Sequence, residues 1–260
     1  MSLLAASTAI PQNGKFWDWV IFLTEEYGNV LLTGCMWTLL IALVGTIVGC
    51  LLGFLAGFVQ TMEVTDADPV PKRLLVMLLK VIVKIYVEVF RGTPMMVQAM
   101  VMFYGLPMIG ISLAAIPCGF LVVSVNTGAY MAESVRGGID SVDAGQFEAG
   151  KSIGLKHFEI MRYIVLPQAA RNIMPQIGNQ LVINIKDTSV LNVISVSELF
   201  FAGKTAASVY YKFFESFFIV AVIYLILTIV VSALIRLVER KMDGAANYRE
   251  EAVPEPVGEE

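Results

Sequence analysis

The feature that most constrains this chain is a stretch of thirty consecutive residues, 30–59, that contains no charged side chain. As an α-helix this stretch would be about 45 Å long, whereas the hydrocarbon core of a bilayer is roughly 30 Å thick. Hydrophobic residues make up 57% of the chain and charged residues 15%, against roughly 25% charged residues in soluble proteins. The sequence therefore predicts an all-α membrane protein. It excludes a soluble enzyme, a nucleic-acid-binding protein and a secreted disulfide scaffold.

The hydropathy pattern predicts five transmembrane helices joined by polar segments. We expect them at residues 30–59, 87–107, 113–135, 177–200 and 213–237. The second lies in an apolar segment, 74–110, that is too long for one simple crossing, and we expect a bend where Gly92 and Pro94 weaken the helix. The first half of that segment carries four charged residues on one helix face: Lys80, Lys84, Glu88 and Arg91. Such a face belongs at an interface or against protein rather than in lipid.

Lysine and arginine residues between the predicted spans indicate the orientation, because cytoplasmic loops carry the excess of them. With the N-terminus outside, the inner segments hold nine of these residues and the outer segments three. The predicted organisation is an extracytoplasmic segment at 1–29, a membrane domain at 30–240 and an acidic, disordered cytoplasmic tail at 241–260. The first residues lack the pattern of a signal peptide, so none is expected. Cys35, Cys50 and Cys118 lie in apolar runs without metal-ligand spacing and are interpreted as buried hydrophobic residues.

Residues 145–152, in the predicted cytoplasmic connection between the third and fourth spans, fit the phosphate-loop pattern G-x-x-x-x-G-K-S. A phosphate loop follows a buried strand, and the residues before Gly145 do not resemble one. Glu148 would also place a carboxylate beside the phosphates. The sequence therefore argues against nucleotide binding by this chain.

The same connection fits a second pattern in its spacing throughout. Glu148-Ala149-Gly150 is followed after three residues by Gly154 and after nine more by Ile164-Val165-Leu166-Pro167. This resembles the EAA motif of the permeases of ATP-binding-cassette (ABC) importers, with Gly150 in place of the usual alanine. The resemblance implies that a loop at about 137–176 docks a cytoplasmic ATPase. Its coupling residues would be Glu148, Ala149, Gly150, Gly154, Ile164, Leu166 and Pro167.

Further segments, in order along the chain, resemble the permeases for histidine, glutamine and arginine uptake. They are FRGTPMMVQ at 90–98, NTGAYMAESVRGGI at 126–139, LPQA at 166–169 and KDTS at 186–189. The resemblance implies the type I transmembrane fold of ABC importers, in a multi-pass protein of the bacterial inner membrane. It also implies a second permease subunit, identical or related, and an extracytoplasmic protein that delivers the amino acid. The chain itself would be no enzyme and would bind no cofactor or metal, since the partner ATPase uses Mg-ATP.

Polar residues inside the predicted spans need an explanation, because burying them in lipid is costly. The candidates for the translocation path are Asn184, Lys186, Asp187, Thr188, Ser189, Gln98 and Arg91. Two interpretations remain open: these groups contact a substrate that carries both charges, or they hydrogen-bond between helices and fix the assembly. Structural or gating roles are predicted for Gly92, Pro94, Glu133 and Arg136, the last two as an ion pair within one helix.

Two rival functions fit the sequence less well. A self-sufficient secondary transporter or channel for a small polar solute would need internal repeats or matching broken helices, and the halves 1–130 and 131–260 show no such repeat. An intramembrane enzyme would need paired carboxylates, a histidine cluster or a metal triad, and the sequence offers none of these.

Overall fold

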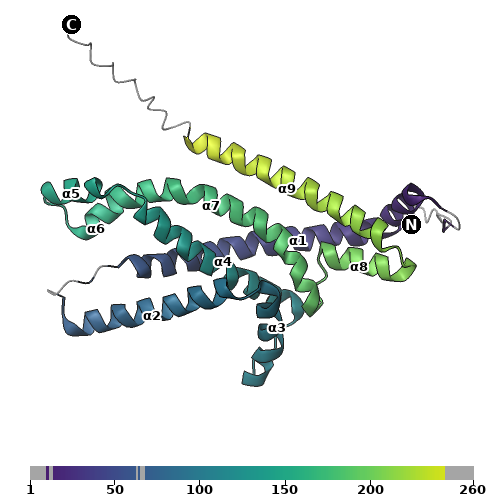
Figure 1. The fold of residues 1–260 in the computed structure, drawn as a ribbon, viewed down its shortest axis with the longest axis horizontal. Helices are drawn as coiled ribbons and strands as arrows, with labels where there is room; N and C mark the ends of the chain where they lie inside the picture. Colours follow the sequence, from purple (N-terminus) through teal and green to yellow (C-terminus); the bar gives the residue numbers. More distant parts are fainter. Residues whose placement is uncertain (1–9, 12–13, 63, 65–67, 244–260) are drawn as a thin grey trace, which may run out of the picture.

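A computed structural model describes residues 10–11, 14–62, 64 and 68–243, the side chains of 241–243 excepted. Every regular element in this part of the chain is helical, as the sequence predicts (Figure 1). The elements are α1 (Phe16–Thr61), α2 (Val70–Gly92), α3 (Met95–Gly105), η1 (Leu106–Ile109), α4 (Ala115–Asp140), α5 (Ala144–Ser152), α6 (His157–Ile160), η2 (Met161–Val165), α7 (Leu166–Asp187), η3 (Thr188–Ile194), α8 (Leu199–Tyr210) and α9 (Phe213–Asp243). The first three residues of the predicted acidic tail, 241–243, belong to α9, and the rest of the tail lies outside the described residues.

The long helices α1, α2, α4, α7 and α9 run roughly along the longest axis of the molecule, and successive ones run in opposite directions (Figure 1). The short helices α5 and α6 lie at the end where α1 finishes and α2 begins. At the opposite end, α8 lies beside the start of α1. α3 points away from the long helices nearer the middle of the molecule.

The packing of α1 on α4 follows a row of glycines. A Cβ atom at Gly53 would lie 2.4 Å from the Cβ of Met131, and one at Gly49 would lie 2.5 Å from the Cβ of Thr127, so neither position has room for a side chain. The row comprises every fourth residue of α1 and faces every fourth residue of α4: Gly45, Gly49, Gly53 and Gly57 against Val123, Thr127, Met131 and Val135. Small residues at this spacing let membrane helices approach closely.

α1 is longer than the predicted first span. It begins at Phe16 and contains 46 residues, which corresponds to about 69 Å of helix. Its N-terminal turns pack against the α8–α9 corner, where the rings of Trp19 and Tyr210 lie 5.9 Å apart and the Nζ of Lys212 lies 4.7 Å from the Trp19 ring centroid. A start at residue 30 was predicted because acidic residues at 18, 25 and 26 interrupt the apolar run.

The second predicted span consists of two helices rather than one bent helix. α2 ends at Gly92 and α3 begins at Met95, with Thr93 and Pro94 between them. Pro94 has no N–H to continue the helical ladder, and Thr93 takes an extended conformation, as residues before proline tend to do. The predicted bend is therefore present, and it is a complete break.

The buried Gln98 side chain closes this break. Its Nε2 donates to the carbonyl oxygens of Phe90 and Thr93, each at 2.9 Å, and its Oε1 accepts from Nδ2 of Asn126 on α4 at 3.0 Å. These bonds satisfy carbonyls that the end of α2 would leave without partners. The break also places two of the candidate path residues on different helices, the exposed Arg91 on α2 and the buried Gln98 on α3.

The fourth predicted span, 177–200, is also not one continuous helix. α7 begins well before it, at Leu166, and passes through η3 to Ile194, after which α8 is turned by 53°. Ser195 adopts a left-handed conformation with φ of 61° at the turn. Because polar residues fill the start of α7, residues up to 176 were assigned to the cytoplasmic loop, which is why the predicted helix began too late.

The buried Glu198 caps the start of α8 after the turn. Its carboxylate oxygens accept the backbone N–H groups of Phe200 and Phe201 at 2.9 and 2.8 Å, and the hydroxyl of Tyr224 on α9 at 2.8 Å. A buried carboxylate with three donors ties the α7–α8 turn to the last helix.

Three helices, α1, α4 and the 213–240 part of α9, are long and apolar enough to cross a membrane, and the bent α7–α8 pair makes up to four. α2 does not meet this standard, and α3 with η1 is a shorter apolar helix. Five crossings and an external N-terminus therefore remain predictions, with the α2–α3 region as the fifth crossing.

The glycine row gives the first testable prediction. Gly53→Val should reduce membrane abundance and the thermal unfolding temperature in detergent, because overpacking at such a contact costs about 1–3 kcal/mol. Gly28→Val is the matched control: Gly28 lies in the same helix, and a Cβ there would meet nothing within 4 Å. Equal unfolding temperatures for the two variants would contradict the tight contact between α1 and α4.

Candidate coupling loop and translocation path

The connection between α4 and α7 forms a helical hairpin at one end of the molecule. α5 and α6 lie side by side at that extremity, and α6 leads through η2 directly into α7 (Figure 1). The Asp143 side chain caps α5 by accepting the backbone N–H of Gly145 at 2.6 Å. The backbone N–H of Lys156 donates to Glu159 at 2.8 Å, which fixes the start of α6. The predicted coupling loop is thus an ordered structure with a cap on each helix.

Two glycines of the EAA pattern shape this hairpin in different ways. Gly154 has φ of +84°, a conformation that glycine takes without strain, and a Cβ there would meet nothing within 4 Å. Gly154 therefore serves the turn rather than a close contact within this chain. Gly150 is buried, and a Cβ there would lie 2.8 Å from Cγ1 of Ile160. The departure from alanine at this position lets α5 approach α6.

The outer surface of the hairpin presents apolar and acidic side chains together. Glu148 and Ala149 are exposed, and among the described residues Glu148 forms no ion pair. Ile153 is 74% exposed and Phe158 is 65% exposed. Large apolar side chains gathered at the end of a helical bundle are typical of a binding surface for another protein.

The last part of the EAA pattern joins the hairpin to α7. Residues 161–165 form a π-helical turn, and Leu166 and Pro167 start α7 directly after it. Ile164 is half-buried, while Leu166 and Pro167 are exposed. Pro167 occupies the first turn of α7, where its missing N–H is tolerated.

Asn184 bonds three helices together inside the bundle. Its Nδ2 donates to the hydroxyl of Thr46 on α1 at 2.7 Å and to the hydroxyl of Thr127 on α4 at 2.9 Å. Its Oδ1 accepts from Nε2 of Gln180 at 3.1 Å. Thr188 is also buried, and its hydroxyl donates to the carbonyl oxygen of Ile185 at 2.9 Å. Buried groups with all these partners fit the second interpretation, in which polar residues connect helices.

Lys186, Asp187 and Ser189 differ from Asn184. Lys186 is exposed, Asp187 and Ser189 are half-buried, and no ion pair among the described residues involves either charge. Lys186 and Asp187 end α7, and Ser189 lies in η3 directly after it. These residues keep the first interpretation open, in which polar side chains line the path.

A polar cavity of about 620 Å³ lies between α4 and α7, next to the end of α2. Arg91 and Glu133 approach across it, with Nη1 and Oε2 at 3.8 Å, and Arg91 also lies over the Tyr130 ring. The predicted ion pair of Glu133 with Arg136 is present, and Arg136 bonds Asp140 at 2.8 Å. Gly92 and Pro94 are exposed at the break beside it.

The α7 side of this cavity was not predicted from the sequence. One side of α7 carries an exposed, mainly polar stripe with spacings of four, three and four residues: Asn172, Gln176, Asn179 and Ile183. Lys186, three residues further on, continues the stripe. The polar spacing was visible in the sequence, but Asn172 and Gln176 lie in the segment, up to residue 176, that had been assigned to the cytoplasmic loop.

The described residues contain no group of three or more histidine, cysteine or acidic side chains that could hold a metal ion. The phosphate-loop letters at 145–152 lie within α5 itself, so their backbone N–H groups are committed to a helix. Cys50 and Cys118 are buried and Cys35 is half-buried, as expected for small hydrophobic residues.

Comparison with known proteins identifies close counterparts of this arrangement. The chain is 42% identical over 160 residues to the glutamine transport system permease protein GlnP of Escherichia coli (strain K12), which covers 61% of this chain and 73% of that protein. It is 40% identical over 162 residues to the probable amino-acid permease protein YxeN of Bacillus subtilis (strain 168), covering 61% and 72%.

Solved structures of ABC transporters are also similar to this chain. A crystal structure of an amino acid ABC transporter with histidines superposes with a TM-score of 0.76 at 31% identity, covering 88% of this chain and 100% of that chain. An inward-facing structure of the MetNI methionine ABC transporter has a TM-score of 0.64 at 19% identity, covering 83% and 95%, which is a likeness of fold. Residues 74–244 match the family described as binding-protein-dependent transport system inner membrane component. The chain belongs to that family of inner-membrane permeases, as its EAA pattern predicted.

Proposed function

We propose that this chain is the permease subunit of an ABC importer that carries a polar amino acid across the bacterial inner membrane by alternating access. The observation that carries this proposal is the hairpin of α5 and α6, which holds the EAA residues at the extremity of the bundle and exposes Glu148, Ile153 and Phe158. The glutamine permease and the other amino-acid permease that the chain resembles support the substrate class.

The hairpin would receive the movement of the ATPase. α6, η2 and α7 follow one another without a loop, so a displacement of α6 would move α7 with it. α7 carries both the exposed polar stripe and the bonds of Asn184 to α1 and α4. Closure of the ATPase would therefore shift the stripe relative to α4 and change which side of the membrane the polar cavity faces.

The translocation path would follow the α7 stripe, with Arg91, Lys186, Asp187 and Ser189 as its charged and polar neighbours. A cavity of about 620 Å³ is within the range of small-molecule sites. It is open on one side, and the second permease, identical or related, would complete it. An amino acid carries both charges, which suits a path that holds arginine, lysine and carboxylate groups.

The partners follow from this role. A cytoplasmic ABC ATPase would bind Mg-ATP and hydrolyse it, an extracytoplasmic binding protein would deliver the amino acid, and this chain would bind no cofactor. Co-purification of the tagged chain tests the proposal, with an expected stoichiometric ATPase. A self-sufficient transporter or channel would purify without one and would move solute without ATP.

Two variants of the hairpin test coupling. Gly154→Val forces a β-branched residue into a left-handed turn, and Glu148→Lys reverses an exposed charge at the docking surface. Both should keep normal membrane abundance, lose most of the bound ATPase and reduce uptake at least tenfold. ATPase per permease after purification and uptake of labelled amino acid in the same cells are the measurements.

The controls for these variants lie far from the hairpin. Gly105→Val places the same side chain where a Cβ would meet nothing within 4 Å, and Glu25→Lys reverses an exposed charge near the start of α1. Both controls should retain the ATPase. Normal ATPase capture by both hairpin variants would refute the docking role.

The predicted topology can be tested with single cysteines. In a background with the three native cysteines replaced by serine, a cysteine at Lys156 should be protected in intact cells and one at Lys204 should react with an impermeant maleimide. Permeabilisation should expose Lys156→Cys. Labelling of Lys156→Cys in intact cells would reverse the proposed orientation.

The two roles of polar residues can be separated by paired variants. Asn184→Ala should lower abundance and uptake together, because it removes the buried amide that donates to the Thr46 and Thr127 hydroxyls, at a cost of about 1–3 kcal/mol. Asp187→Asn should lower uptake several-fold at unchanged abundance. Parallel losses of abundance and uptake in Asp187→Asn would assign that residue to helix packing instead.

A further inference from the structure

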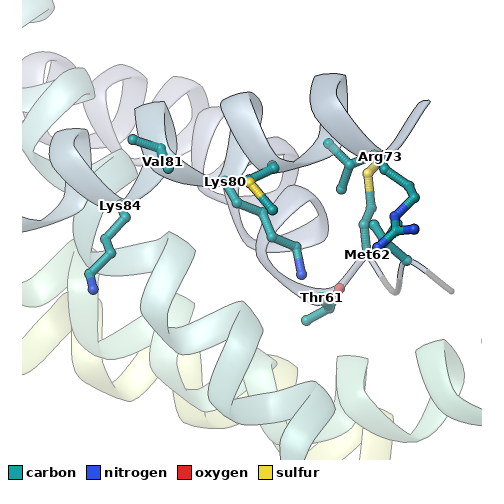
Figure 2. A pocket seen from close by; sticks show the side chains of 9 residues that line it. Thr61, Met62, Arg73, Lys80, Val81 and Lys84 are labelled. Carbon is teal, nitrogen blue, oxygen red and sulfur yellow. The ribbon is translucent and has the colours of Figure 1, made fainter. Parts of the chain in front are cut away.

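A second cavity, of about 590 Å³, lies between the end of α1 and the first half of α2, away from the proposed path. Three cations of α2 line it, namely Arg73, Lys80 and Lys84. Figure 2 shows their side chains extending from α2 to the same side, with Arg73 and Lys80 directed toward Thr61 and Met62 of the α1 end. A pocket with this charge is suited to an anion.

Lys80 and Lys84 have no counter-ion within the part of the chain that the structure describes. None of the ion pairs among those residues involves either ammonium group. A neighbouring cavity is lined by both lysines together with Glu88 and Glu133. Neither carboxylate forms an ion pair with the lysines, and Glu133 is already bonded to Arg136. Two cations without a counter-ion among the described residues, on a helix with many apolar neighbours, are costly unless an anion from outside that part of the chain approaches them.

The rest of the pocket wall is apolar, which argues against a simple inorganic anion. Its lining includes Met62, Val76, Met77 and Val81, of which Met77 and Val81 are exposed at the rim. The opposite face of α2 exposes a row of large aliphatic side chains along most of the helix: Leu74, Leu78, Ile82, Ile85 and Val89. α2 is therefore an amphipathic helix with a lipid-facing side next to a basic pocket.

We infer that this pocket binds one anionic phospholipid, with its phosphate between Lys80 and Lys84 and its acyl chains leaving past Met77 and Val81 along the apolar flank of α2. Basic pockets between membrane helices on the cytoplasmic side are known sites for anionic headgroups. The end of α1 and the start of α2 lie beside α5 and α6, so the lipid would occupy the cytoplasmic leaflet under the proposed topology. Lipid binding itself does not depend on the transport role.

The pocket also borders the coupling hairpin. A further cavity joins Met62 and Val76 on the α1–α2 side to Phe158 and Met161 on the hairpin side. A lipid in the basic pocket would therefore lie close to the element that the ATPase is proposed to contact. Binding of this one lipid molecule can be measured on the purified protein without a transport assay.

The test is phospholipid retention by the purified full-length chain with its co-purifying partners. After exchange into detergent containing equal amounts of phosphatidylglycerol and phosphatidylcholine, native mass spectrometry counts the bound lipid. We expect about one phosphatidylglycerol per chain and little phosphatidylcholine. Lys80→Gln with Lys84→Gln should weaken phosphatidylglycerol binding about 30-fold, which is about 1 kcal/mol for each lysine.

A matched control measures general attraction of cations to anionic lipid. Arg236 and Arg240 are exposed cations four residues apart near the end of α9, at the same end of the molecule and away from the pocket. Arg236→Gln with Arg240→Gln should leave retention unchanged. Equal losses in both double variants would overturn the site, because binding would then reflect overall charge.

Two further variants separate the pocket from a folding defect. Lys80→Arg with Lys84→Arg keeps the charge and should keep the lipid, whereas Val81→Trp fills the rim without changing the charge and should displace it. Inorganic phosphate at about 10 mM, a concentration well below physiological ionic strength, should not compete, because it lacks the acyl chains. Complete displacement by phosphate, or full retention by Val81→Trp, would overturn the lipid assignment while leaving the proposed transport role untouched.

Discussion

The close approach of α1 and α4 along the glycine row is the contact on which the rest of the structure depends. In lipid, apolar side chains gain little by leaving the solvent, so helices associate through dispersion contacts and hydrogen bonds that require short distances. The row provides these distances at four positions spaced one turn apart. It also brings Thr46 and Thr127 close enough for one amide, that of Asn184, to bond both. The position of α7 therefore depends on the contact between two other helices.

The two breaks in the helices follow a common rule. Inside a membrane, carbonyl and N–H groups released by a break must find new partners within the protein. At the α2–α3 break the Gln98 amide bonds the freed carbonyls, and at the α7–α8 turn the Glu198 carboxylate bonds the freed N–H groups. Each of these side chains also bonds another helix, through Asn126 or Tyr224. The bends are thus fixed elements of the bundle rather than loose joints.

The sequence was sufficient for the family, the all-α fold and the coupling hairpin, because those depend on local spacing. The spacing of Glu148, Gly154 and Pro167 along the chain indicates the hairpin without any knowledge of distant contacts. The breaks were harder to predict, since Gln98 and Glu198 act through partners far along the chain. The start of α7 was missed for a related reason: its polar residues resemble a loop unless the helical stripe is recognised across Asn172, Gln176 and Asn179.

The polar residues of α7 lie on two faces of the helix, and the interpretation that they connect helices applies to one of these faces. Gln180 and Asn184, four residues apart, are buried against α1 and α4 and have partners there. Asn179 and Lys186, seven residues apart, lie on the exposed side. A helix that is polar on both sides cannot have lipid on the second side without a large cost, so that side must meet water or another polypeptide. The proposed path shared with a second permease would satisfy both conditions, because water would fill the cavity and the partner would exclude the lipid.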